Sequence, residues 1–304
     1  MQLVQAKAAP FDLDSVRRLV GEDWNAVNRE IQAQLSSDVA LVNSVAHYII
    51  SSGGKRLRPL LVLAACEAVG GLGQAALRAA CAVELIHAYS LVHDDMPCMD
   101  NDVLRRGKPT VHVRFGQAQA LLAGAALQAL AFELLTPEDG VPPAMQARLC
   151  RLLAQAAGAD GMAGGQAIDL ASVGRQLTQD QLRHMHRLKT GALLRASVVM
   201  GAACGEPAGV AEQALAQYGA AIGLAFQVVD DVLDVTQDSA TLGKTAGKDA
   251  ASDKPTYVSL MGLDAARDHA EALRAEAHAA LAASGLADTR ALAALADMVV
   301  RRSH

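Results

Sequence analysis

Residues 93–102 read HDDMPCMDND, and residues 230–234 read DDVLD. Both acidic clusters stand in sequence that is otherwise apolar and helical in character, where unneutralised charge is expensive to bury. A single acidic pair is often a solvated helix face, but two clusters embedded in apolar sequence favour a cationic ligand. The fold therefore has to accommodate the carboxylates of Asp94, Asp95, Asp230, Asp231 and Asp234.

The second cluster follows a run without a helix breaker after Gly223, so Asp230 and Asp234 are expected on one face of a helix. Two like charges at this spacing repel each other unless a multivalent cation lies between them. Carboxylate ligands without Cys or His favour a hard ion, and magnesium completes its coordination with water and phosphate oxygens. The cluster thus predicts magnesium together with a phosphorylated ligand.

The first cluster needs a bend in the chain. Asp94 and Asp100 are six residues apart, which would place them on nearly opposite faces of a straight helix. Pro97 lies between them and disfavours a continuous helix, because proline lacks a backbone donor and clashes with the preceding turn. We expect the helix to end near Met96 and the chain to bend so that Asp100 returns toward Asp94.

The composition predicts closely packed helices. Apolar residues make up 52% of the 304 residues and aromatic residues only 3%, and strand-like alternation is nearly absent. Glycine and proline recur at the spacing expected between helices. We therefore expect an all-α protein, a single domain over residues 1–304 with ten or more helices.

Several partners and locations are disfavoured. The net charge is -5, and no basic patch is interleaved with aromatic residues, which argues against a nucleic-acid partner. No apolar stretch reaches the ~20 residues that span a bilayer, and the N-terminus lacks a signal-peptide pattern. The five cysteines are scattered, as in proteins with reduced thiols. These features predict a soluble, cytoplasmic protein that does not span a membrane.

Basic residues accompany both acidic clusters. Residues 51–59 read SSGGKRLRP, and residues 105–108 read RRGK directly after the first cluster. Arginine suits bidentate contacts with phosphate. Further cations near the second cluster are Lys189, Lys244, Lys248 and Lys254. Because no hydrolase triad or histidine metal site is evident, the pattern favours a departing diphosphate stabilised electrostatically, with apolar helices around a central apolar cavity.

Five sequence motifs resemble those of a known family. GGKRLRP, ELIHAYSLVHDDMPCMDNDVLRRGKPT, GGQAIDL, HRLKTGALL and GLAFQVVDDVLDVTQDSATLGKTAGKD occur in this order between about residues 46 and 257. They resemble those of the trans-isoprenyl diphosphate synthases, most closely the bacterial farnesyl diphosphate synthases. The resemblance implies the isoprenoid synthase fold, a homodimer, and head-to-tail condensation of isopentenyl diphosphate with an allylic diphosphate.

The resemblance also implies roles for individual residues. Three magnesium ions would be held by Asp94, Asp100 and Asp230, with Asp95, Asp231 and Asp234 in support. The allylic diphosphate would be held by Arg105, Lys189, Lys244 and Lys254. Isopentenyl diphosphate would be bound without metal by Lys55, Arg58, His87 and Arg106. Thr190 and Gln227 would face the reacting carbons, and the final proton would leave to the released diphosphate.

Product length is expected to depend on the helix that carries the first cluster. Tyr89 and Ser90 precede Asp94 by five and four residues, so they lie a turn or more down that helix. A growing tail would run along this face and stop at the Tyr89 ring, which in the resembled family goes with a fifteen-carbon product. Farnesyl diphosphate is therefore the expected product, with geranylgeranyl or geranyl diphosphate as the alternative.

Three other functions fit parts of the pattern. A terpene cyclase shares the metal-triggered chemistry but needs no isopentenyl diphosphate site, against which GGKRLRP and Arg106 argue. A non-catalytic subunit of a longer-chain synthase normally lacks one Asp cluster, whereas both are intact here. A helical scaffold with incidental acidic faces would show no stabilisation by diphosphate with magnesium. The roles of Arg301 and Arg302 are not assigned by the sequence.

Overall fold

The structure is a computed structural model that describes residues 24–34, 40–50, 54, 56–237 and 255–302. Lys55, Lys244, Lys248 and Lys254 lie outside the described residues. The elements are α2 (Trp24–Gln34), α3 (Ala40–Ile50), α4 (Leu57–Ala68), α5 (Gly73–Asp94), β1 (Leu104–Arg105), β2 (Lys108–Pro109), α6 (Val111–Phe115), α7 (Gln117–Glu133), α8 (Pro143–Ala157), α9 (Met162–Ala171), α10 (Gln179–His186), the π-helical turn η1 (Arg187–Gly191), α11 (Ala192–Ala203), α12 (Gly209–Thr236), α15 (Tyr257–Met261), α16 (Leu263–Ala283) and α17 (Arg290–Arg301). The prediction of an all-α bundle with ten or more helices is confirmed.

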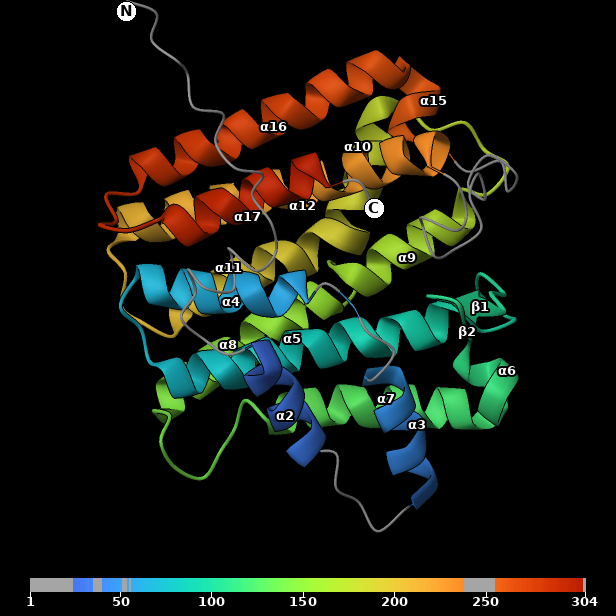
Figure 1. The fold of residues 1–304 in the computed structure, drawn as a ribbon, viewed down its shortest axis with the longest axis horizontal. Helices are drawn as coiled ribbons and strands as arrows, with labels where there is room; N and C mark the ends of the chain where they lie inside the picture. The colour runs from blue at the N-terminus through green and yellow to red at the C-terminus, as the bar shows by residue number, and fades with distance from the viewer. Residues whose placement is uncertain (1–23, 35–39, 51–53, 55, 238–254, 303–304) are drawn as a thin grey trace, which may run out of the picture.

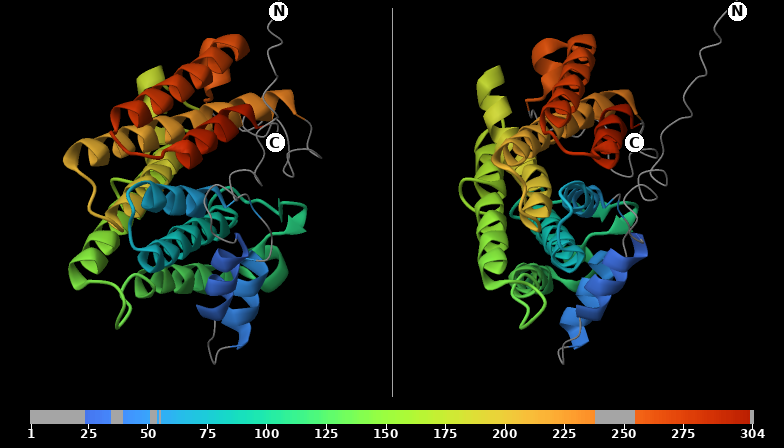
Figure 2. Two further views of the ribbon diagram at one scale, coloured as in Figure 1. Left: turned by 60° about the vertical axis from the view of Figure 1, so that its left-hand side comes forward. Right: turned by 90° about the vertical axis from the view of Figure 1, so that its left-hand side faces the viewer.

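The helices form a layered bundle around α5, α11 and α12. Helices α16 and α17 lie at one end, and α2, α3 and α7 lie at the other, with α4 and α5 between them (Figures 1 and 2). Small residues let the central helices approach closely, since a Cβ atom at Gly201 would lie 2.2 Å from the Val62 carbonyl oxygen. At Gly223 a Cβ atom would lie 2.8 Å from Cα of Gly191, which joins α12 to η1. These contacts pack α11 against α4, and α12, which carries the second acidic cluster, against η1.

Helix α5 is the central element. It is long and apolar enough to cross a membrane, but 78% of its apolar window is buried inside the protein, as expected for a core helix. Among the described residues it is the one helix with this property. Even Glu84 is buried, because its carboxylate pairs with the Arg56 guanidinium at 2.5 Å. The periodic sequence of this segment therefore corresponds to a helix buried on nearly every side.

The first acidic cluster bends as the sequence indicates. Helix α5 ends at Asp94, two residues before the expected end at Met96. The backbone N–H of Asp100 donates to the Asp94 carbonyl oxygen at 2.8 Å, and that of Asp102 donates to the Asp95 carbonyl oxygen at 3.1 Å. The turn after Pro97 thus folds back onto the end of α5.

The short hairpin that follows was not expected from the sequence. Leu104 pairs with Pro109 and Arg105 with Lys108, leaving a two-residue turn. Both turn residues have positive φ, 53° at Arg106 and 73° at Gly107, as a primed turn between antiparallel strands requires. With two residues in each strand, this hairpin shows almost no sequence periodicity, and its effect is to turn the two arginines back toward α5.

Candidate active site

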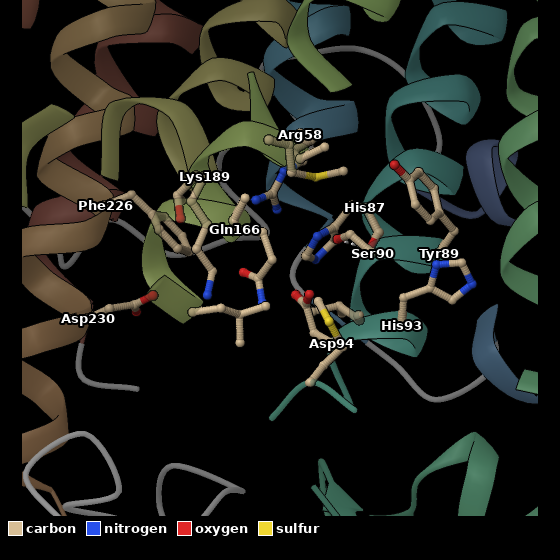
Figure 3. Close-up of a pocket in the computed structure, with 17 residues that line it drawn as sticks. Arg58, His87, Tyr89, Ser90, His93, Asp94, Gln166, Lys189, Phe226 and Asp230 are labelled. Atoms are coloured by element: carbon tan, nitrogen blue, oxygen red, sulfur yellow. Dashed lines mark hydrogen bonds between the residues drawn. The ribbon is translucent and has the colours of Figure 1, made fainter. Parts of the chain in front are cut away.

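A cavity of about 420 Å³ opens between α5 on one side and α9, η1 and α12 on the other. Figure 3 shows Asp94, Ser90 and His87 on the α5 side, facing Asp230 and Phe226 on α12, with Gln166 and Lys189 between them. Polar residues gather toward the carboxylates, and apolar ones fill the rest. The lining side chains are Arg58, His87, Tyr89, Ser90, Leu91, His93, Asp94, Met99, Met162, Ala163, Gln166, Ala167, Leu170, Lys189, Thr190, Phe226 and Asp230.

The electrostatics at Asp94 fit a bound cation. Burial raises the pKa of its carboxyl to about 6, and the neighbouring charge of Asp100 adds to the shift, while Lys189 opposes it. The carboxylate is therefore held in a place where water and protein neutralise it poorly. Magnesium uses one or two carboxylates of this kind and takes its other oxygens from water and phosphate. Within the described residues no three acidic, imidazole or thiol groups converge on one point.

Asp95 faces away from this cavity and holds the hairpin. Its carboxylate is 4% exposed and accepts hydrogen bonds from Arg105 Nη2 at 2.6 Å and Arg105 Nε at 2.9 Å. These two residues line a smaller recess behind α5, together with Arg106 and Lys108. The structure therefore brings Arg105 to the first cluster as the partner of Asp95, whereas the sequence assigned it to a diphosphate.

Asp230 lies in the cavity wall and carries an ion pair that the sequence did not indicate. Arg302 Nη2 lies 2.5 Å from Asp230 Oδ1 and donates at 2.8 Å to the Phe226 carbonyl oxygen. The Arg302 guanidinium also stacks over the Phe226 ring at 4.0 Å. The end of α17 is thereby joined to the second acidic cluster, which gives Arg302 a definite structural role.

This ion pair distinguishes Asp230 from Asp94 in the protein without ligand. Asp230→Ala should lower the free energy of unfolding by about 1–3 kcal/mol, because it leaves the Arg302 side chain, 10% exposed, without its carboxylate. Asp94→Ala should not do so. Urea unfolding of both variants without metal measures the difference. An Asp230→Ala protein as stable as the wild type would show that the ion pair contributes nothing.

The other acids of the second cluster are buried behind the cavity wall. Asp231 Oδ1 accepts from Gln227 Nε2 at 2.9 Å, and Asp231 Oδ2 accepts from the Tyr257 N–H at 2.8 Å, which caps the start of α15. Thr190 Oγ1 donates to Gln227 Oε1 at 3.1 Å. Thr190 lines the cavity, whereas Gln227 is not among the lining residues and orients Thr190 from behind. Asp234 is 5% exposed.

Lys189 and Gln166 enter the cavity from η1 and α9. Lys189 Nζ lies 2.6 Å from Asp169 Oδ2, so that carboxylate positions the ammonium group. A Cβ atom at Gly165 would lie 2.1 Å from the Lys189 backbone nitrogen, which explains the glycine pair before Gln166. Both side-chain polar atoms of Gln166 are buried and have no hydrogen-bond partner among the described residues. A buried amide of this kind needs a polar partner, which a bound ligand or an ordered water can supply.

The opposite end of the polar region is positively charged. His87 is partly buried, and its pKa lies well below 6.5 because of desolvation and the nearby charges of Arg58, Arg106, Arg105 and Arg56. Burial likewise lowers the pKa of Arg58, whose buried Nε has no hydrogen-bond partner in the part of the chain that the structure describes. The excess positive charge around a neutral imidazole fits an anion.

Two arginines near this positive charge have strained backbone conformations. Arg56 has φ 50° and Arg106 has φ 53°, values that non-glycine residues seldom adopt. A Cβ atom at Gly54 would lie 2.8 Å from Arg106 Nη1, so glycine lets the segment before α4 pack against this side chain. The GGKRLRP motif therefore packs against the hairpin, and Arg58 and Arg106 face the same region.

The apolar end of the cavity follows α5 away from Asp94. Tyr89 and Ser90 both line it, as the helix geometry indicates. The Ser90 hydroxyl donates to the His87 carbonyl oxygen at 2.9 Å, so it is occupied within the helix. The Tyr89 ring lies edge to face against the His93 ring, with 5.6 Å between the ring centres. Sequence reasoning thus placed both residues but missed the His93 contact.

Four lining or supporting residues were not identified from the sequence: Gln166, Asp169, Phe226 and Arg302. Gln166 and Asp169 belong to the GGQAIDL segment, where a glycine pair beside polar residues in an apolar helix was the available signal. Phe226 and Arg302 gave no comparable signal, because their contact joins positions 76 residues apart.

Comparison with known proteins places these features in one family. The Polyprenyl synthetase family matches residues 39–290. A probable farnesyl diphosphate synthase of Sinorhizobium fredii (strain NBRC 101917 / NGR234) is 51% identical over 299 residues, covering 94% of this chain and 88% of that protein. Geranylgeranyl pyrophosphate synthase 7 of Arabidopsis thaliana is 45% identical over 284 residues, covering 92% and 82%.

Solved structures agree with the sequence relatives. An FPP/GFPP synthase from Zymomonas mobilis has a TM-score of 0.83 at 39% identity, covering 95% of this chain and all of that one. A geranyltransferase from Helicobacter pylori, solved with magnesium and isoprenyl diphosphate, has a TM-score of 0.79 at 31% identity, covering 97% and 98%. The similarity therefore extends over nearly the whole chain.

Proposed function

This chain belongs to the Polyprenyl synthetase family, and from that premise we propose that it condenses isopentenyl diphosphate with dimethylallyl and then geranyl diphosphate to give farnesyl diphosphate. Its action as a prenyl diphosphate synthase follows from the family; the farnesyl product is the proposed part. The observation that carries it is the Tyr89 ring, which lines the apolar end of the cavity one turn below Asp94.

The allylic diphosphate is proposed to lie between the two acidic clusters. Magnesium, three ions by family resemblance, would be held by Asp94, Asp100 and Asp230 and would make the diphosphate a better leaving group. Lys189, fixed by Asp169, points its ammonium group into the same space. Arg105, Asp95 and Asp231 would support this arrangement through the hydrogen bonds described above, and Asp234 would support it from its buried position on α12. Lys244 and Lys254 are assigned to it from the sequence only.

Isopentenyl diphosphate is proposed to bind at the positive end, where Arg58 and Arg106 surround His87. Lys55 is assigned to the same group from the sequence. The two diphosphates would then place their carbon chains side by side above Thr190, whose hydroxyl group can stabilise a developing allylic cation. The final proton would pass to the released diphosphate, which requires no protein base.

A twenty-carbon product is the second candidate. It is favoured by the geranylgeranyl synthases among the relatives, of which the Arabidopsis protein is 45% identical. Against it stands the size of Tyr89, because a ring at the end of an apolar pocket excludes additional carbon atoms by steric contact. The two candidates differ in a directly measurable product.

The product test uses wild-type protein and Tyr89→Ala. With isopentenyl diphosphate and either dimethylallyl or geranyl diphosphate, wild-type protein should yield mainly farnesyl diphosphate. Tyr89→Ala should shift the products toward geranylgeranyl diphosphate while keeping the first condensation, because it removes the ring and leaves the diphosphate sites intact. Chromatography of dephosphorylated products reads the outcome. Mainly C20 product from the wild type would refute the farnesyl assignment.

We also propose that the protein is a cytoplasmic homodimer. Its supporting feature is a group of exposed apolar side chains on adjoining helices: Leu121 is 53% and Leu122 is 62% exposed on α7, and Val113 is 50% exposed on α6. Exposed apolar side chains of this size are groups that a partner chain can cover.

A further inference from the structure

At the apolar end of the cavity, Tyr89 packs against a second ring of α5, that of His93. Its ring meets the His93 ring edge to face, with 5.6 Å between the centres and 73° between the planes. The His93 imidazole in turn reaches α7, where Nε2 lies 3.2 Å from the Leu121 carbonyl oxygen. Because a carbonyl oxygen only accepts, this contact is a hydrogen bond donated by Nε2. Both rings belong to α5 (Figure 3).

The space for this imidazole is provided by a glycine on α7. A Cβ atom at Gly124 would lie 2.1 Å from His93 Nε2 and 2.6 Å from His93 Cδ2. Helix geometry does not demand glycine here, since Gly124 lies within α7 and a mid-helix glycine costs stability. Glycine is needed at position 124 because any side chain there would collide with the His93 ring. The imidazole is therefore confined between the α7 backbone and the Tyr89 ring.

We propose that His93 is a positioning residue for product length: held by α7, it fixes the Tyr89 ring at the end of the cavity. This inference rests on the proposed function. Aromatic rings in edge-to-face contact prefer one geometry, whereas a ring without such a neighbour can rotate about its side-chain bonds. A Tyr89 ring that rotates away would admit one further isoprene unit. The position of α7, and not only the size of residue 89, then sets the chain length.

The first test measures product ratios of His93→Ala with dimethylallyl and isopentenyl diphosphate. The ratio of C20 to C15 product should rise roughly two- to tenfold, the factor that corresponds to the strength of one aromatic contact. His93→Gln should fall between His93→Ala and wild type, because its amide can donate to the same Leu121 carbonyl oxygen. Thermal unfolding of each variant is measured in parallel.

The second test adds a methyl group at Gly124. Gly124→Ala should displace the imidazole and change the product ratio in the wild-type background. In the His93→Ala background the same methyl group should have no effect on the ratio, since nothing remains to be displaced. Gly73→Ala, at the other end of α5, is the matched control because a Cβ atom there has no neighbour within 4 Å.

The outcomes separate the inference from the proposed function. Wild-type protein that makes no prenyl diphosphate contradicts the proposed function itself. If Tyr89→Ala lengthens the product but His93→Ala leaves the product ratio unchanged, the inference alone is overturned. The same holds if His93→Ala lowers the melting temperature without changing the product ratio. A Gly124→Ala effect that persists undiminished in the His93→Ala background also overturns it, because the methyl group would then act through another neighbour.

Discussion

Asp94→Asn is expected to lower turnover by on the order of 10³ or more while raising the stability of the protein without ligand. The loss follows because the amide carries no charge with which to hold magnesium beside the departing diphosphate. The gain follows because the carboxylate is buried near Asp100 and Asp95, which raises its pKa to about 6. Replacement by the neutral isostere removes that repulsion without a change in volume.

The pH dependence of this gain has a definite sign. The model-compound pKa of Asp94 is 3.8, and its pKa in the folded protein is about 6, so the folded state binds the proton more tightly. Below pH 3.8 the group is protonated in both states and costs nothing. The unfavourable contribution grows between pH 3.8 and 6 and is complete above pH 6, with an upper limit of roughly 3 kcal/mol.

Urea unfolding of wild type and Asp94→Asn at pH 4.5 and pH 7.5, without metal, measures this difference. The advantage of the variant should be larger at pH 7.5. Ser90→Ala is a control on the same helix, since its hydroxyl bonds only to the His87 carbonyl oxygen within the helix. Near-normal turnover of Asp94→Asn with magnesium would remove Asp94 from the metal ligands, and an equal advantage at both pH values would refute the assigned pKa.

The same loss of turnover is expected for Asp230→Ala, but with the opposite change in stability. Both residues face one cavity, and both are proposed to hold magnesium there. Within the described residues, Asp230 forms an ion pair with Arg302 at 2.5 Å, whereas Asp94 forms no direct ion pair. The pair of variants therefore separates the metal function of a carboxylate from its contribution to folding.

The fold was predictable from the sequence to the extent that local chemistry determined it. Composition and breaker spacing sufficed for the all-α class, and Pro97 sufficed for the bend that brings the Asp100 N–H to the Asp94 carbonyl oxygen. The hairpin at residues 104–109 was missed because its strands are two residues long. Its turn depends on positive φ at Arg106. This conformation is uncommon for arginine, and the neighbouring sequence does not predict it.

The site was predictable as a set of residue types more than as a set of contacts. Spacing placed Asp94 and Asp230 on helices that face one cavity. It could not show that Asp231 caps α15, since the partner N–H comes from position 257, after the long segment 238–254. Nor could it show that Arg302 reaches Asp230, because helical periodicity carries no information about tertiary partners.

The cavity has three chemically different regions, and residues of α5 contribute to each of them. Arginines surround His87 at one side, carboxylates border the centre at Asp94, and Tyr89 with His93 closes the apolar end. The two proposed substrates each carry a diphosphate group. Separate regions for the two diphosphates would let their carbon chains meet without both groups competing for one binding site. The arrangement implies that the two diphosphate sites can be impaired independently.

Arg58→Ala tests that independence. Arg58 has a buried Nε without a protein partner, and Glu84 and Asp230 are the acids that favour its charged form. Removal of one charge-assisted contact to a diphosphate should raise the KM for isopentenyl diphosphate about 10- to 100-fold. The KM for the allylic substrate should change much less, because that diphosphate is assigned to Asp94, Asp230 and Lys189.

Ionisation of the allylic substrate can be followed without the second substrate. We expect geranyl diphosphate to solvolyse slowly when magnesium and the acidic clusters are in place, and Arg58→Ala should leave this rate within a few-fold of wild type. Arg175→Ala, on an exposed segment outside the cavity, serves as the charge-matched control. If solvolysis and isopentenyl diphosphate binding fell by the same factor, Arg58 would act on both sites, and the division of the cavity into two diphosphate sites would be wrong.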